Sequence, residues 1–138
     1  AAVKVDITSV LQAAAELPGA AAEGAGDRFQ FTMHQPEGRR QSVQLRFGRE
    51  DSDGDELLLI YSVCGPAKEK YYEEVLRKNV TMPAGAFAIH DIDGQPCFVI
   101  VDSLLAASLT ARQLAKSIDE LASRADIVER GLTKEDRR

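Results

Sequence analysis

The side chains most able to do chemistry gather in AFAIHDIDGQPCFVIVD, residues 86–102. This stretch holds His90, Cys97 and, next to the histidine, Asp91. Imidazole and thiolate are the ligands that zinc prefers, and the same two groups can form a nucleophile and its base. The stretch could therefore be a metal or active site, or it could be a β-hairpin with polar ends.

A strong turn signal favours the hairpin. Asp93-Gly94 is typical of a type I′ turn, because that turn needs positive φ angles and glycine adopts them at low cost. This turn pairs His90 with Cys97 and Ala88 with Val99, and directly paired residues share a face of the sheet. One face then carries the bulky side chains of a core: Phe87, Ile89, Phe98 and Ile100. The other face, which ends in His90 and Cys97, carries small apolar side chains: Ala86, Ala88, Val99 and Val101.

A metal site or an active site at His90 and Cys97 would need further ligands or catalytic groups, which the sequence does not supply. A structural zinc site needs four ligands and a catalytic one three, and the remaining candidates, His34 and Cys64, lie at no recognised ligand spacing. A Cys/His nucleophile would need a lowered thiol pKa and an oxyanion site, which no nearby helix start or glycine turn supplies. We therefore predict no catalytic residue, no metal ligand and no cofactor. A small enzyme or metal-binding protein that uses His90, Cys97 and Asp91 remains the alternative hypothesis.

Two other motifs also fail on spacing. In DSDGDE, residues 51–56, a calcium loop that begins at Asp51 would need glycine at its sixth position and glutamate at its twelfth. The sequence has Glu56 and Ser62 at these positions, which predicts a solvated loop. GAGDRF, residues 24–29, lacks the third glycine of a dinucleotide-binding fingerprint and precedes a strand pattern rather than a helix.

Composition restricts the class of protein further. A chain of 138 residues fits one domain. Its net charge of −5 and its pI near 5.1 argue against a nucleic-acid surface, which would be basic. The sequence contains no apolar run long enough for a membrane span, so we expect no membrane contact and a cytoplasmic protein. Cys64 and Cys97 lie in apolar strand patterns and are predicted to be buried free thiols.

Apolar periodicity places the elements along the chain. We predict a first helix over residues 5–17, a mobile small-residue linker over 18–26 and an alternating strand pair at 28–34 and 42–48. A continuous apolar strand at 57–65 should be central in the sheet or covered on both faces, and a second helix should follow over 67–79. The hairpin of residues 86–102 comes next, and a capping box from Thr110 to Gln113 opens a long last helix that ends at Gly131.

These elements predict an α+β fold of order α-β-β-β-α-β-β-α, an antiparallel sheet with helices packed on one face. The single domain divides into an N-terminal helix to residue 17, the linker 18–26, the sheet and helices over 27–130 and a charged tail over 131–138. The small-residue strip of Ala86, Ala88, Val99 and Val101 is either covered by another element or meets a partner. We take it as the candidate partner-binding surface.

Residues 57–130 carry a family likeness. It rests on LLLIYSVCGPA, on LRKNVTMPAGAFAIHDIDG and on CFVIVDSLLAASLTARQLAKSIDELASRADIVE. With the order of elements, these segments resemble the bacterial YbjN-type family and the class I type III secretion chaperones, and the last segment looks closer to the YbjN-type sequences. The small-residue linker departs from the chaperone pattern.

The resemblance implies a non-enzymatic protein, a homodimer that holds a segment of another protein along apolar patches. No binding residue can be carried over from these families, so the small-residue strip is an inference from this chain alone.

Overall fold

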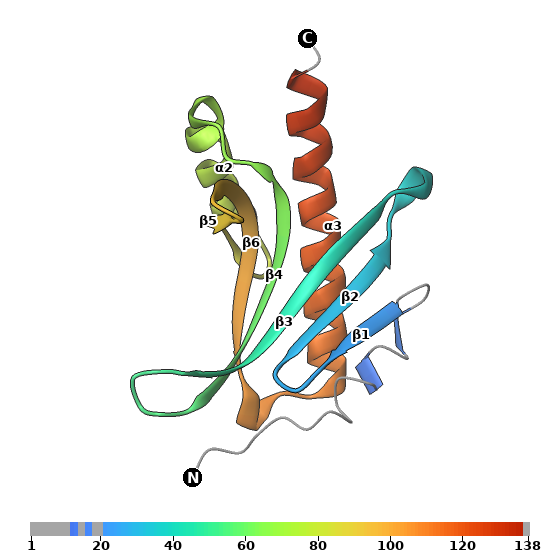
Figure 1. Ribbon diagram of the computed structural model, residues 1–138, viewed down its shortest axis with the longest axis vertical. Helices are drawn as coiled ribbons and strands as arrows, with labels where there is room; N and C mark the ends of the chain where they lie inside the picture. The colour runs from blue at the N-terminus through green and yellow to red at the C-terminus, as the bar shows by residue number, and fades with distance from the viewer. Residues whose placement is uncertain (1–11, 14–15, 18–20, 137–138) are drawn as a thin grey trace.

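Six antiparallel strands form one sheet, and α-helices pack against it in the computed structural model, which describes residues 12–13, 16–17 and 21–136 (Figure 1). The fold is α+β, as predicted. The elements run in the order β1 (Ala21–Ala25), β2 (Arg28–His34), β3 (Arg40–Glu50), β4 (Glu56–Pro66), α2 (Tyr72–Lys78), β5 (Ala86–Ile92), β6 (Gln95–Leu105) and α3 (Ala111–Asp136).

The strands lie in the order β1-β2-β3-β4-β6-β5. The continuous apolar strand, β4, is central, as predicted, and pairs with β3 and β6. The alternating pair forms the β2–β3 hairpin, in which Phe29, Phe31 and Met33 are buried opposite a second buried set on β3. That set consists of Gln41, Val43 and Leu45.

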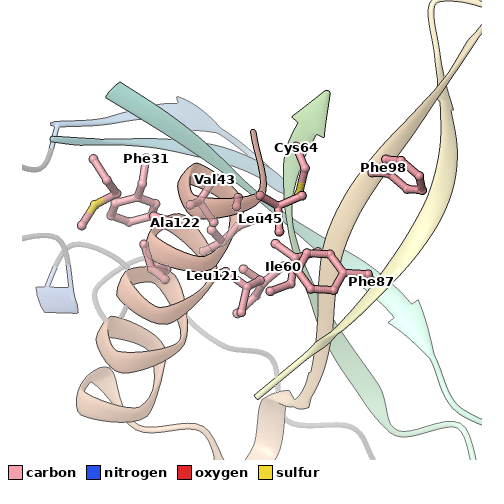
Figure 2. Close-up of a cluster of buried hydrophobic side chains, with 14 of the residues drawn as sticks. Phe31, Val43, Leu45, Ile60, Cys64, Phe87, Phe98, Leu121 and Ala122 are labelled. Atoms are coloured by element: carbon pink, nitrogen blue, oxygen red, sulfur yellow. The ribbon is translucent and has the colours of Figure 1, made fainter. Parts of the chain in front are cut away.

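The core lies between the sheet and α3 (Figure 2). Phe31, Val43, Leu45 and Ile60 of the sheet face this helix. The helix buries one continuous apolar stripe, as its spacing predicts: Leu114, Ile118, Leu121, Ala122, Ala125 and Val128. Such burial of apolar area is the main source of folding free energy in a domain of this size.

Both ends of α3 can be compared with their predictions. The capping box is confirmed: the Gln113 N–H donates to Thr110 Oγ1 at 3.1 Å, and the Thr110 N–H donates to Gln113 Oε1 at 3.0 Å. The predicted end at Gly131 is wrong, because the helix continues to Asp136. Leu132 extends the buried stripe past the glycine, and this packing outweighs a helix penalty of about 1 kcal/mol for glycine.

β1 occupies the segment predicted to be a linker. Its Ala and Gly residues pair with β2 from Ala21 opposite Thr32 to Ala25 opposite Arg28, which leaves Gly26-Asp27 as a two-residue turn. At Gly24 the chain passes so close to β2 that a Cβ would lie 2.4 Å from the Arg28 carbonyl oxygen. Four strands therefore precede α2, one more than predicted.

The predictions for the two remaining helices have different outcomes. Of the first predicted helix, Gln12, Ala13 and Glu16 are helical and Leu17 packs against the core, while its other residues lie outside the described residues. The second helix is shorter than predicted. A 3-10 turn over Glu69–Tyr71 precedes the seven residues of α2.

Candidate functional site

The hairpin of β5 and β6 has the predicted register. His90 pairs with Cys97 and Ala88 pairs with Val99. The turn residues Asp93 and Gly94 have φ angles of 49° and 80°, as a type I′ turn requires. The pairing therefore fixes which side chains of this stretch can meet.

The three residues of the chemical hypothesis do not converge. His90 and Cys97 are cross-strand neighbours, but Asp91 follows His90 on the strand, and successive strand residues point to opposite faces. The ring of His90 instead lies 6.0 Å from the ring of Tyr61, edge to face. Among the described residues, one group of three side chains has its carboxylate oxygens close enough to share a metal ion, within 4.8 Å of one another. It consists of Asp51, Asp53 and Asp55.

These three aspartates shape the loop between β3 and β4. The Asp51 carboxylate accepts hydrogen bonds from the backbone N–H groups of Asp53, at 2.9 Å, and of Asp55, at 3.0 Å. Short carboxylates commonly form turns in this way. The loop is solvated, as predicted, and Asp53 and Asp55 are exposed.

The two cysteines are free thiols in different environments. Cys64 is buried, and Cys97 is half-buried. Burial, together with the smaller effect of the nearby Glu129 carboxylate, raises the pKa of the Cys64 thiol to about 12. Because the thiolate is the reactive form of cysteine, Cys64 is unsuited to nucleophilic chemistry at neutral pH.

The bulky face of the hairpin is only partly enclosed. Phe87, Phe98 and Ile100 are buried as predicted, but the prediction of a core position is wrong for Ile89, which is 47% exposed. β5 is the last strand of the sheet, and the short α2 does not extend over Ile89. An apolar groove of about 190 Å³ remains between α2 and β5. Its lining includes Tyr72, Val75, Leu76, Phe87, Ile89 and Phe98.

The sequence predicted a helix over residues 67–79 but not this groove. The helical spacing of Tyr72, Val75 and Leu76 was the available signal, but the groove also depends on the short length of α2, which the sequence did not predict.

The small-residue strip lies on the opposite face of the sheet from α3. Tyr61 pairs with Val101 on this face, and its ring reaches over β6 to meet His90 on β5. Val99 lies on β6 between these two rings and is only 3% exposed. Ala86 is exposed, and Ala88 and Val101 are half-buried. The accessible residues of the strip, Ala86, Ala88 and Val101, therefore lie beside the paired rings of Tyr61 and His90.

The uncovered face changes character between β3 and β4. On β2 and β3 it carries polar residues, among them Gln30 and Gln44, which hydrogen-bond to each other at 2.9 Å. On β4 and β6 it carries Leu59 and Val101, because Leu59 pairs with Arg46 and Ser103, which share its face. Arg46 lies at the boundary and donates to the Tyr61 hydroxyl at 2.8 Å. One half of this face is solvated, and the other presents mainly apolar side chains, with the exposed Ser103 and His90 among them.

The sequence matches no protein-family model, and no curated protein matches it. None of the described helices is long and apolar enough to cross a membrane.

Proposed function

We propose that this chain is a non-enzymatic protein-interaction module that binds a segment of another protein on the apolar half of its uncovered sheet face. The observation that supports the proposal most is the division of that face, polar over β2 and β3 and apolar over β4, β6 and β5. A face that served only as a solvated surface would be polar throughout, as antiparallel sheets with one wet face are.

The accessible apolar side chains of β4, β5 and β6 on this face are those that a partner would contact. One of them is Leu105, which pairs with Leu57 and is 48% exposed. The others are Leu57, Leu59, Val63, Ala86, Ala88 and Val101. Contiguous apolar side chains on a protein surface commonly mark an interaction site. Val99 is buried on the same face and would support this surface rather than contact the partner itself.

The partner class, the homodimer and the bacterial cytoplasm remain proposals. They rest on the resemblance to YbjN-type proteins and secretion chaperones, and free thiols are common in a reducing compartment. Light scattering at tens of micromolar protein should give twice the chain mass of 15.0 kDa. A monomer under these conditions would contradict the dimer.

The binding surface can be tested with a library of peptides displayed from the proteome of the source cell. Selected peptides should bind the Leu59→Lys variant about tenfold more weakly than the native chain, since a lysine would interrupt the apolar surface. Gln44→Lys is the matched control, because it places the same charge on the polar half of the same face. Thermal unfolding should show that both variants fold. Equal loss in the two variants, or no loss in either, would contradict the proposal.

A further inference from the structure

Three exposed large apolar side chains lie beside the outer edge of the sheet. Leu76 on α2 is 59% exposed, Ile89 on β5 is 47% exposed, and both line the groove between these elements. Val80 is 91% exposed and follows Leu76 by four residues along a continuous helical path, so it lies one turn further on the same side. Most large apolar side chains in the described residues are buried, so this group marks a surface adapted to contact.

The strand beside this group has open hydrogen-bonding groups. β5 pairs only with β6, and its two-residue turn makes Ile92 and Gln95 the first hydrogen-bonded pair. Alternation then directs the backbone N–H and C=O groups of Phe87, Ile89 and Asp91 outward. No partner for the outward groups of Ile89 and Asp91 is found among the residues that the structure describes.

At Phe87 a side chain already occupies the place of a neighbouring strand. The Phe87 N–H donates to Asn79 Oδ1 at 2.6 Å, and Asn79 Nδ2 donates to the Phe87 carbonyl at 3.4 Å. A side-chain amide offers the same donor and acceptor as a peptide bond. Asn79 thus ends the open part of the edge, which runs from Ile89 to the turn.

We propose that this open edge binds an extended basic segment of another protein as an added strand. In such a strand, side chains two residues apart point to the same face. One apolar side chain would enter the groove beside Ile89, and a lysine or arginine two residues along would meet the exposed Asp91 carboxylate. Asp93 at the turn and the net charge of −5 add to the attraction. This inference goes beyond the proposed function, because it concerns a different surface and holds even if the uncovered face binds nothing.

A basic segment fits this edge better than a second copy of the chain. Because Asn79 binds the outward backbone groups of Phe87, two copies related by a two-fold axis can use both open residues, Ile89 and Asp91, only in a register centred on His90. That register would set each Asp91 opposite an Ile89, a carboxylate against an apolar side chain. Binding of a basic peptide gives Asp91 an opposite charge instead.

The test uses an array of fluorescein-labelled heptapeptides with alternating threonines, in which an apolar residue is followed two positions later by Lys or Arg. Matched peptides carry Glu at the basic position. Fluorescence anisotropy should show the tightest basic peptide binding about tenfold more strongly than its acidic match, with an affinity that falls as salt is added. N-methylation of alternate peptide amides should abolish binding, because it removes the strand hydrogen bonds.

The Leu76→Asp variant should weaken binding of that peptide about tenfold. Leu105→Asp is the control, since Leu105 is 48% exposed at the other end of β6. The variant Asp91→Lys should reverse the preference toward the acidic peptide, and it replaces an exposed side chain outside the core.

Three results would overturn the inference: no peptide of the array binds, the N-methylated or acidic peptides bind as well as the basic ones, or Leu105→Asp weakens binding as much as Leu76→Asp. Self-association of the native chain that Leu76→Asp abolishes would also overturn it, because the occupant would then be a second copy.

Discussion

The two helices α2 and α3 cover different parts of the same sheet face and leave different surfaces behind. α3 spans 26 residues and buries its apolar stripe over β2, β3, β4 and β6. α2 has seven residues, contacts β5 and leaves Leu76 exposed above an open groove. Helix length therefore decides where apolar surface becomes core and where it stays available for a partner.

The largest expected effect compares one leucine from each helix. Leu121→Ala on α3 should lower the free energy of unfolding by about 3 kcal/mol, because the side chain is fully buried and its removal leaves a cavity. Leu76→Ala on α2 should cost less than about 0.5 kcal/mol. Urea unfolding measures both values, and similar costs would contradict the comparison.

The link between α2 and β5 should have an intermediate effect. Asn79→Ala removes both hydrogen bonds to the Phe87 backbone and should cost about 1–2 kcal/mol. Hydrogen exchange of the Phe87 amide should become faster, while the amide of Leu121 keeps its protection. Unchanged exchange at Phe87 would show that Asn79 does not close this part of the edge.

The start of α3 depends on its capping box. Thr110→Ala should lower the free energy of unfolding by about 1 kcal/mol, because the Gln113 N–H loses its acceptor. Thr110→Ser keeps an oxygen at this position and serves as the control. A serine variant as unstable as the alanine variant would mean that the threonine methyl group, not the cap, matters.

The two cysteines can be compared in the native protein by their rates of alkylation, without any substitution. In the native protein iodoacetamide should label Cys97 and leave Cys64 unlabelled, even at pH 9, because burial raises the pKa of the Cys64 thiol to about 12. In the unfolded chain Cys64 would ionise at its ordinary pKa of 9.0, whereas in the folded protein it stays protonated. The free energy of unfolding should therefore fall as the pH rises above 9.0. Mass spectrometry after addition of urea should find both thiols labelled. Labelling of native Cys64 at pH 9 would show that this part of the core opens.

Prediction from sequence succeeded where short-range signals agree with burial. The Asp93-Gly94 turn determines every pair of the β5–β6 hairpin, and the spacing of Leu114, Ile118 and Leu121 marks the buried side of α3. β1 was missed because Ala and Gly side chains carry no alternation. Its stability comes from pairing with β2, although Gly26-Asp27 was a usable hairpin signal.

The candidate surfaces were harder to predict, because exposure depends on how far neighbouring elements reach. The register identified the face that carries Ala88 and Val101, but not the burial of Val99 on that face, nor the contact between the Tyr61 and His90 rings across β6. Ile89 shares a face with the core, and its exposure follows from its position on the edge strand beside the short α2.

The most direct test of the account maps where a partner binds. Amide shifts of the ¹⁵N-labelled chain can be followed while the tightest peptide from the proteome selection is added. The account predicts changes at Leu59, Ala88 and Val101 on the uncovered face, and none at Gln30 or Gln44. Changes centred on the polar half, on β2 and β3, would contradict it.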